Sequence, residues 1–236
     1  MSPTDIDLVI GNTSAQDQPR SFDGIIDDIR IYNYELSESD ISTLYYEGGW
    51  EGPGDPETST FVDVRDGQEY ALVEIGNQTW MAENLNYIST NSFYYNNDPS
   101  YGEIYGRLYT FDDAINVCPS GWHLPTDDEW KVLETELGMP EEDLDILDVL
   151  MTDENWRGDI QGRMMKEGGS SGLNLNLGGY SHTSSFYSMN EYGRYWSSSE
   201  YGETEALNRF FWSDSDAVRR RHNPKDRLFS VRYVKD

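Results

Sequence analysis

Apolar and polar residues alternate along several short stretches of the chain, which is the pattern of strands with one buried face. This pattern predicts strands at Ile6–Ile10, Phe22–Asn33, Tyr195–Ser198, Asn208–Trp212 and Leu228–Val234. Within residues 61–85 it predicts two or three more strands, joined by turns at residues 65–68 and 76–77. In the last stretch Phe229, Val231 and Tyr233 alternate with polar or smaller neighbours, so we expect a strand that lies on the core.

Capping residues mark two helices in the middle of the chain. Thr126 and Glu129 form a capping box, which satisfies two orphan amides at a helix start. The helix that follows places three apolar side chains on one face and ends at Gly138; they are Trp130, Leu133 and Leu137. Thr110 is the expected N-cap of a second, shorter helix that ends at Val117.

Two further helices and two loop regions complete the predicted layout. A short helix is expected at Leu36–Tyr46 with Ser37 as its N-cap. Another is expected at Pro140–Leu150, with its three leucines (Leu144, Leu147 and Leu150) turned inward. Asn86–Ile104 reads as a long surface loop, and the chain after Gly168 reads as short strands between long loops. The predicted fold class is therefore α+β, with short antiparallel strands, two or three helices and long loops.

A run of Pro, Gly and acidic residues divides the chain. Glu51–Thr60 has the composition of a linker. We therefore expect a small β-rich segment at residues 1–49, a linker at 50–60 and a larger domain at 61–236.

Composition changes this picture in two ways. The chain holds 7 Trp, 17 Tyr and 8 Phe, so a core can form from comparatively few, large side chains. The net charge of -27 disfavours nucleic acid and anionic membranes as partners, because both carry negative phosphates. Residues 209–236 nevertheless hold eight basic and four acidic residues. We expect this basic end to pair internally with the acidic remainder.

Few residues suggest catalysis or membrane insertion. Cys118 is the single cysteine, which excludes an intramolecular disulfide and a thiolate metal cluster. No stretch approaches 18 apolar residues, so we expect no membrane span. The first residues lack the parts of a signal peptide, which fits either an intracellular protein or, as we expect, a piece of a secreted one. His123 is expected at the surface or in a hydrogen bond, and no distinctive carboxylate pair suggests a glycosidase.

Five ordered motifs carry a family resemblance over residues 61–236; they span Asp66–Tyr87, Tyr105–Trp130, Gly178–Tyr180, Tyr195–Glu200 and Leu228–Asp236. Together they resemble the Fibrobacter succinogenes major paralogous domain. The resemblance implies a C-type-lectin-like fold, in which the first and last strands pair, two helices flank the sheet and long loops carry a ligand face. Gly121–Trp130 is also similar to the formylglycine-generating-enzyme branch of that fold.

The chain lacks several residues that these families use for catalysis, disulfide formation or calcium binding. Formylglycine-generating oxidases need a copper-binding cysteine pair, which one cysteine cannot supply. Family members usually carry a cysteine where Tyr233 stands, able to pair with the one matching Cys118, and often a further pair around Phe93–Tyr101. The calcium-binding tripeptides of C-type lectins are missing, and Trp212-Ser213-Asp214 is a poor approximation to one of them. We therefore expect no cofactor, although calcium bound by other carboxylates stays open.

The N-terminal segment carries a second resemblance. Phe22–Asn33 and Glu35–Tyr45 resemble the closing strand and helix of a laminin-G/concanavalin-A-like sandwich. These residues would form only the end of such a domain, because two strands and a helix cannot close a sandwich. We expect the parent protein to carry a concanavalin-like domain upstream of residue 61 and to be secreted or attached to a cell surface.

The remaining candidate chemistry is recognition. Residues 181–226 are rich in Tyr, Ser, Asn, Trp and Arg, the residues of adaptable binding surfaces. We expect a non-enzymatic module that binds glycan or protein there, and the alternatives are a structural assembly module or, less favoured, a hydrolase. The predicted ligand contacts are Tyr187, Tyr192, Arg194, Trp212, Arg220 and His222. The competing interpretation is that Arg219–Arg221 only neutralise neighbouring acids.

Overall fold

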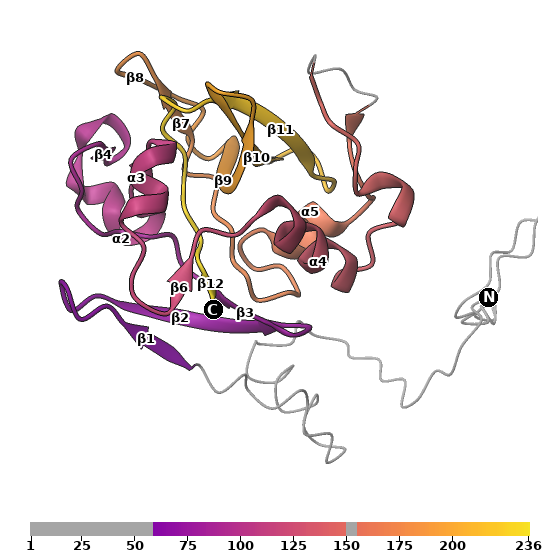
Figure 1. Ribbon diagram of the computed structural model, residues 1–236, viewed down its shortest axis with the longest axis horizontal. Coiled ribbons are helices and arrows are strands. Elements are labelled where there is room, and N and C mark those ends of the chain that lie inside the picture. Colours follow the sequence, from indigo (N-terminus) through magenta and orange to yellow (C-terminus); the bar gives the residue numbers. More distant parts are fainter. Residues whose placement is uncertain (1–58, 150–154) are drawn as a thin grey trace, which may run out of the picture. The chain divides into compact units, whose positions relative to one another are not determined.

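The computed structural model describes residues 59–149 and 155–236 (Figure 1). The predicted concanavalin-like segment at 1–49, with its strands and helix, lies outside these residues, as do most of the linker and Leu150. The described part is a mixed α+β domain with four α-helices and several small, antiparallel sheets. The predicted α+β class is therefore confirmed at this level.

A five-stranded sheet contains both ends of the domain. Its strands are β1 (Thr60–Val62), β2 (Glu69–Ile75), β3 (Gln78–Met81), β6 (Trp122–His123) and β12 (Val234–Lys235). Their order is β1-β2-β3-β12-β6, so the last strand lies between β3 and β6 (Figure 1). The expected pairing of the first and last strands is therefore wrong, because β1 pairs with β2 and β12 pairs with β3 and β6. The predicted turns join the first three strands, and Gly67 and Gly76 adopt positive φ there.

A second, three-stranded sheet carries most of the predicted loop face. It consists of β9 (Tyr192–Tyr201), β10 (Glu205–Trp212) and β11 (Arg219–Pro224), in the order β11-β10-β9. The sequence pattern predicted the first two of these, although both are longer than expected. It missed β11, because the run of arginines from Arg219 to Arg221 suggests exposed loop and not a buried strand.

Small elements connect the two sheets. The helices are α2 (Gly102–Tyr105), α3 (Phe111–Asn116), α4 (Asp127–Glu136) and α5 (Gln161–Met165). Two short ribbons pair β4 (Ser92–Phe93) with β5 (Leu108–Tyr109), and β7 (Tyr180–His182) with β8 (Ser185–Tyr187). Single turns of 3-10 helix lie at Tyr95–Asn97, Pro99–Tyr101 and Glu141–Asp143. The expected loop at residues 86–104 thus contains β4, two 3-10 turns and part of α2.

The two capped helices form as predicted. The Thr126 side chain accepts a hydrogen bond from the Glu129 amide, and the Glu129 carboxylate accepts one from the Thr126 amide. Thr110 caps α3 in the simpler way, by accepting from the Asp113 amide. Trp130 and Leu133 are fully buried on the inner face of α4, while Leu137 is half-buried at its C-cap.

The predicted helix at residues 140–150 is wrong in the described part. Only one 3-10 turn forms there, followed by an irregular segment. The amide of Asp148 donates to the carbonyl of Arg220, and the Asp148 carboxylate accepts from Arg219 at 3.0 Å. Pairing with β11 therefore outweighs the local helical pattern of leucines.

The segment before β12 runs through the interior of the domain. Phe229, Val231 and Tyr233 belong to a hydrophobic cluster with Trp122 and Trp196, while Val234 belongs to a second cluster around Trp130. The predicted alternation is thus present, but both faces of the segment are buried. Regular strand pairing is limited to β12, and the residues before it form only isolated bridges. The predicted continuous strand over residues 228–234 is therefore wrong.

Arg232 is a charged residue within this buried segment, and hydrogen bonds compensate for its burial. Its guanidinium is fully buried and donates to the carbonyls of Met81, Leu173 and Asn174 and to the side chain of Asn84, at 2.6–3.0 Å. These acceptors come from two distant parts of the chain. Arg232 therefore ties the C-terminal segment to both of them.

Candidate ligand-binding site

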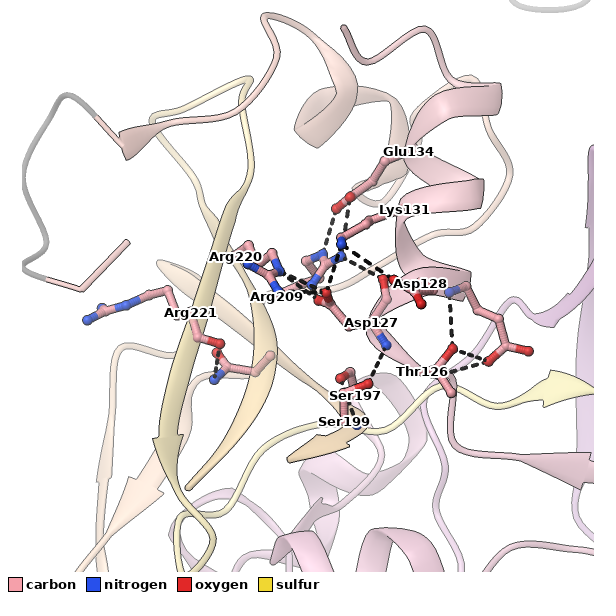
Figure 2. A network of polar contacts seen from close by, with 12 residues as sticks. Thr126, Asp127, Asp128, Lys131, Glu134, Ser197, Ser199, Arg209, Arg220 and Arg221 are labelled. Atoms are coloured by element: carbon pink, nitrogen blue, oxygen red, sulfur yellow. Dashed lines mark hydrogen bonds and ion pairs between the residues drawn. The ribbon is translucent and has the colours of Figure 1, made fainter. Parts of the chain in front are cut away.

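The inner face of the three-stranded sheet holds a buried ion-pair network with α4 (Figure 2). Arg209 donates to the Asp127 carboxylate and to the Glu134 carboxylate, each at 2.6 Å. Arg220 donates to both oxygens of Asp127 at 2.9 Å, and Arg157 pairs with Glu134. The basic end of the chain therefore pairs internally, as the composition predicted.

This network decides the role of Arg220. Burial alone would raise the pKa of Asp127, but Arg209 and Arg220 together hold it well below its usual range. Arg220 is thus committed to a structural carboxylate, in agreement with the competing interpretation that this arginine neutralises a neighbouring acid. It lies on the face opposite to Tyr192 and Trp212, so it does not share a surface with these two predicted contacts.

Tyr187 and Arg194 lie together at hairpin β7–β8. The ring of Tyr187, which is 40% exposed, stacks on Tyr180 with centroids 5.4 Å apart. The Tyr180 ring also lies over the guanidinium of Arg194, at 4.6 Å. Arg194 itself is only 5% exposed and donates to the side chain of Asn223. Tyr187 is exposed at the surface, whereas the Arg194 side chain is buried beneath the ring of Tyr180.

Tyr192 and Trp212 form a half-buried aromatic edge. Trp212 stacks on Trp156 with centroids 6.3 Å apart, and Tyr192 packs edge-on against Phe210 and Trp212. These residues are brought together because β9 and β10 pair with Tyr192 opposite Trp212. The structure thus groups the two predicted residues and adds Trp156, which the sequence did not suggest.

His222 is separate from these rings. It stacks on Tyr201 with centroids 4.1 Å apart, and its Nδ1 lies 2.6 Å from the Glu205 carboxylate. Both partners come from the ends of β9 and β10 where they meet. The six predicted residues therefore fall in four places instead of one site.

A hollow lies beside hairpin β7–β8. Its volume is about 370 Å³, in the range of small-ligand sites. Its polar lining includes His182, Thr183 and Ser184 at the hairpin tip, Asn91 and Asp226; the rings of Phe93 and Phe186 add apolar walls. A second hollow of about 550 Å³ shares Asn91, Thr110 and Asp226 with the first, so the two adjoin.

The hairpin turn that forms one wall is strained. Thr183 and Ser184 have φ of 49° and 63°, the left-handed values of a type I′ turn. Such turns favour Asn-Gly, and a β-branched residue at positive φ is uncommon. Backbone strain of this kind tends to be kept where it serves a site. The two hydroxyl residues of this tip are visible in the sequence, but the alternation of apolar and polar residues does not mark them as part of a site.

The lining of this hollow offers few side chains suited to histidine or cysteine chemistry. Among the described residues that line it, His182 is the only histidine or cysteine. The Cys118 thiol lies elsewhere, half-buried, and donates to the carbonyl of Trp122 at 2.7 Å. His123 is hydrogen-bonded at both ring nitrogens, to Asp236 and Glu129, as expected for a structural histidine. Burial opposes its charged form, but these two carboxylates outweigh burial and raise its pKa.

Cys118 should be unreactive in the native protein. Burial raises the pKa of its thiol to about 12, so the thiolate is scarce near neutral pH. We expect the disulfide reagent dithiobis(nitrobenzoate) at pH 8 to react with the Cys118 thiol of the native chain at least about 100-fold more slowly than with that of the chain in urea. A Cys118→Ser variant supplies the blank. Equal rates for native and unfolded chains would contradict the burial of this thiol.

Residues 59–149 and 155–236 show neither a metal cluster nor a membrane span. No group of three or more His, Cys, Asp or Glu side chains is placed to hold a metal ion there. In the same residues no helix has the length and apolar character needed to cross a bilayer.

These observations define a class of protein: a mixed α+β domain whose candidate site is a polar and aromatic hollow between loops. The family model of the Fibrobacter succinogenes major domain matches residues 73–235. The chain belongs to this family. The comparisons with curated proteins and with solved structures gave no match.

Proposed function

We propose that residues 61–236 form a non-enzymatic recognition module that binds a glycan in the hollow beside hairpin β7–β8. The observation that carries this proposal is the lining of the hollow. It combines hydroxyls, side-chain amides and a carboxylate, which can bond sugar hydroxyls, with phenylalanine rings on which a sugar can pack. Asp226 accepts hydrogen bonds, while Asn91 and Asn97 can both donate and accept.

We also propose that the frame is C-type-lectin-like and that the module acts outside the cell, downstream of a concanavalin-like domain. Two features support the frame: β12 lies in the sheet of β2 and β3, and α3 and α4 each pack against β9. A frame built this way holds the hairpin tip and the segment around Asp226 on separate loops. The hollow between them can then vary without disturbing the core.

A glycan array probed with the whole chain tests the proposal, followed by titration of the strongest glycan. We expect Phe186→Ala to weaken binding at least about fivefold, because truncating an aromatic residue that dominates a binding site costs more than about 1 kcal/mol. Asp226→Asn should weaken it as well, because the neutral amide replaces a strong acceptor.

Asp128→Asn is the matched control for Asp226→Asn. Asp128 lies on α4, outside the hollow, with its side chain 91% exposed. We expect no change in glycan affinity for this variant. Unchanged binding by the Phe186→Ala/Asp226→Asn double variant, with native circular dichroism, would place the site elsewhere. An array without any bound glycan would overturn the choice of ligand.

A further inference from the structure

The arginines on the two faces of the three-stranded sheet have different partners. On the inner face, Arg157, Arg209 and Arg220 share two buried carboxylates, Asp127 and Glu134, at hydrogen-bonding distance. Figure 2 shows Arg220 turned toward α4, while Arg221, the next residue of β11, points to the opposite side of the sheet. Arg221 there joins Arg194 of β9 on the outer face, both being buried.

Among the residues that the structure describes, few carboxylates lie on the outer face. Arg194 has no ion pair with any residue that the structure describes; it donates instead to the neutral amide of Asn223 at 3.0 Å. Arg221 lies 3.5 Å from the Asp148 carboxylate, which already accepts a hydrogen bond from Arg219 at 3.0 Å. Arg194 and Arg221 therefore share little compensation for two positive charges.

Hydrogen-bond donors on this face also lack acceptors. Within residues 59–149 and 155–236, Nε of Arg194 and both Nε and Nη1 of Arg221 have no hydrogen-bond partner. Arg194 is only 5% exposed and Arg221 only 7%, so water has little access to their side chains. Unsatisfied buried donors are costly, and an uncompensated buried charge is costlier still. Burial accordingly lowers the pKa of Arg194 to about 10, with Arg221 contributing, and lowers that of Arg221.

Aromatic rings relieve part of this cost but accept none of the in-plane hydrogen bonds. The faces of Tyr180 and Phe210 lie 4.6 and 4.9 Å from the Arg194 guanidinium carbon. Rings occupy the flat faces of a guanidinium, while its N–H groups point outward in the plane and need an acceptor. The half-buried rings of Tyr180, Tyr192 and Trp212 bring the edge of this face to the surface.

We propose that Arg194 and Arg221 form an anion-binding site that takes the carboxylate of an acidic saccharide. A carboxylate would supply the missing acceptors for the guanidinium forks, in the planar geometry that arginine favours. The neighbouring rings would pack on the sugar. The site is separate from the hollow, because neither the two arginines nor the rings beside them line the hollow. The choice of a saccharide rests on the proposed recognition function, whereas the anion site stands independently.

D-galacturonate tests the proposal, with D-galactose as its neutral twin, in thermal unfolding of the whole chain at constant ionic strength. We expect galacturonate to raise the Tm by about 2–4 °C near saturation, with galactose giving no comparable shift. Arg221→Met should abolish the response. Its Tm without ligand should match or exceed that of the wild type, because Asp148 keeps Arg219 as its partner while a surplus charge is removed. Arg194→Gln is the second variant and should also lose the response.

Two control variants distinguish this site from the hollow and from a general loss of positive charge. Phe186→Ala, in the hollow, should keep the full galacturonate response, so failure of the hollow as a glycan site would leave this result intact. Arg163→Met removes an exposed arginine that pairs with Asp216 and should also keep it. A galacturonate response that survives Arg221→Met and Arg194→Gln would overturn the site, as would equal shifts with both sugars or no shift with galacturonate, galactose or hexaglutamate. A shift with hexaglutamate but not with galacturonate would overturn the saccharide as ligand.

Discussion

Replacing Arg209 by methionine should destabilise the domain by about 3–5 kcal/mol, the usual cost of breaking a buried ion pair. Arg209 is fully buried and bridges Asp127 and Glu134, which lie two turns apart on α4. Methionine fills much of the space but leaves both carboxylates with one fewer donor. Urea unfolding followed by circular dichroism measures the change. A loss of this size is a large fraction of the roughly 5–15 kcal/mol typical of a domain.

The same variant should have a weaker pH dependence. The pKa of Asp127 in the native protein lies well below its ordinary value of 3.8, so its pairing stabilises the fold above that pH and is lost as the pH falls below it. Removing Arg209 reduces this difference. Arg163→Met, an exposed arginine paired with Asp216, should cost less than about 1 kcal/mol. Equal losses for the two variants would contradict the structural role of Arg209.

Trp130→Ala should cost about 3–5 kcal/mol, the range for a large buried aromatic deleted from a core. Trp130 is fully buried between the ring of Trp80, 4.9 Å away, and that of Tyr195, 6.4 Å away. The cavity would open where α4 meets the second hydrophobic cluster. Thermal and urea unfolding measure the loss, and a change below about 1 kcal/mol would contradict this packing.

Trp130→Phe is the control for that prediction. The indole nitrogen of Trp130 has no hydrogen-bond partner among the described residues, so its removal sacrifices no bond. Phenylalanine keeps most of the aromatic contact. We therefore expect a clearly smaller loss than for alanine, with the difference reporting packing alone.

Local signals in the sequence predicted the parts of the fold that local interactions determine. The capping box at Thr126 joins residues three apart, and the β2–β3 hairpin is fixed by its turn and its alternation. The burial of β11 depends instead on distant partners. Arg220 meets Asp127 across 93 residues of chain, and Arg219 meets Asp148 across 71. A single sequence offers no means of matching these charges.

The lining of the hollow lies partly inside the predicted loop region of residues 181–226 and partly outside it. The hollow takes its lining from separate segments, around Asn91, Thr110, the hairpin tip and Asp226, which the fold alone brings together. Tyr187, Tyr192 and Trp212 lie at the surface as expected, because rings at strand ends commonly remain half-exposed. Arg194 lies on the same face of the sheet as Tyr192 but is buried, while alternation along β11 turns Arg220 to the opposite face, toward Asp127.

The position of β12 between β3 and β6 has a consequence for synthesis on the ribosome. A total of 153 positions separate Met81, at the end of β3, from Val234, at the start of β12. At roughly 5–20 residues per second, β3 waits about 8–30 s for its neighbour to be made. Until then the nascent chain cannot close either hydrophobic cluster, since both draw residues from the last eight positions. The domain must therefore fold in one late event, and its early strands need protection from aggregation in the meantime.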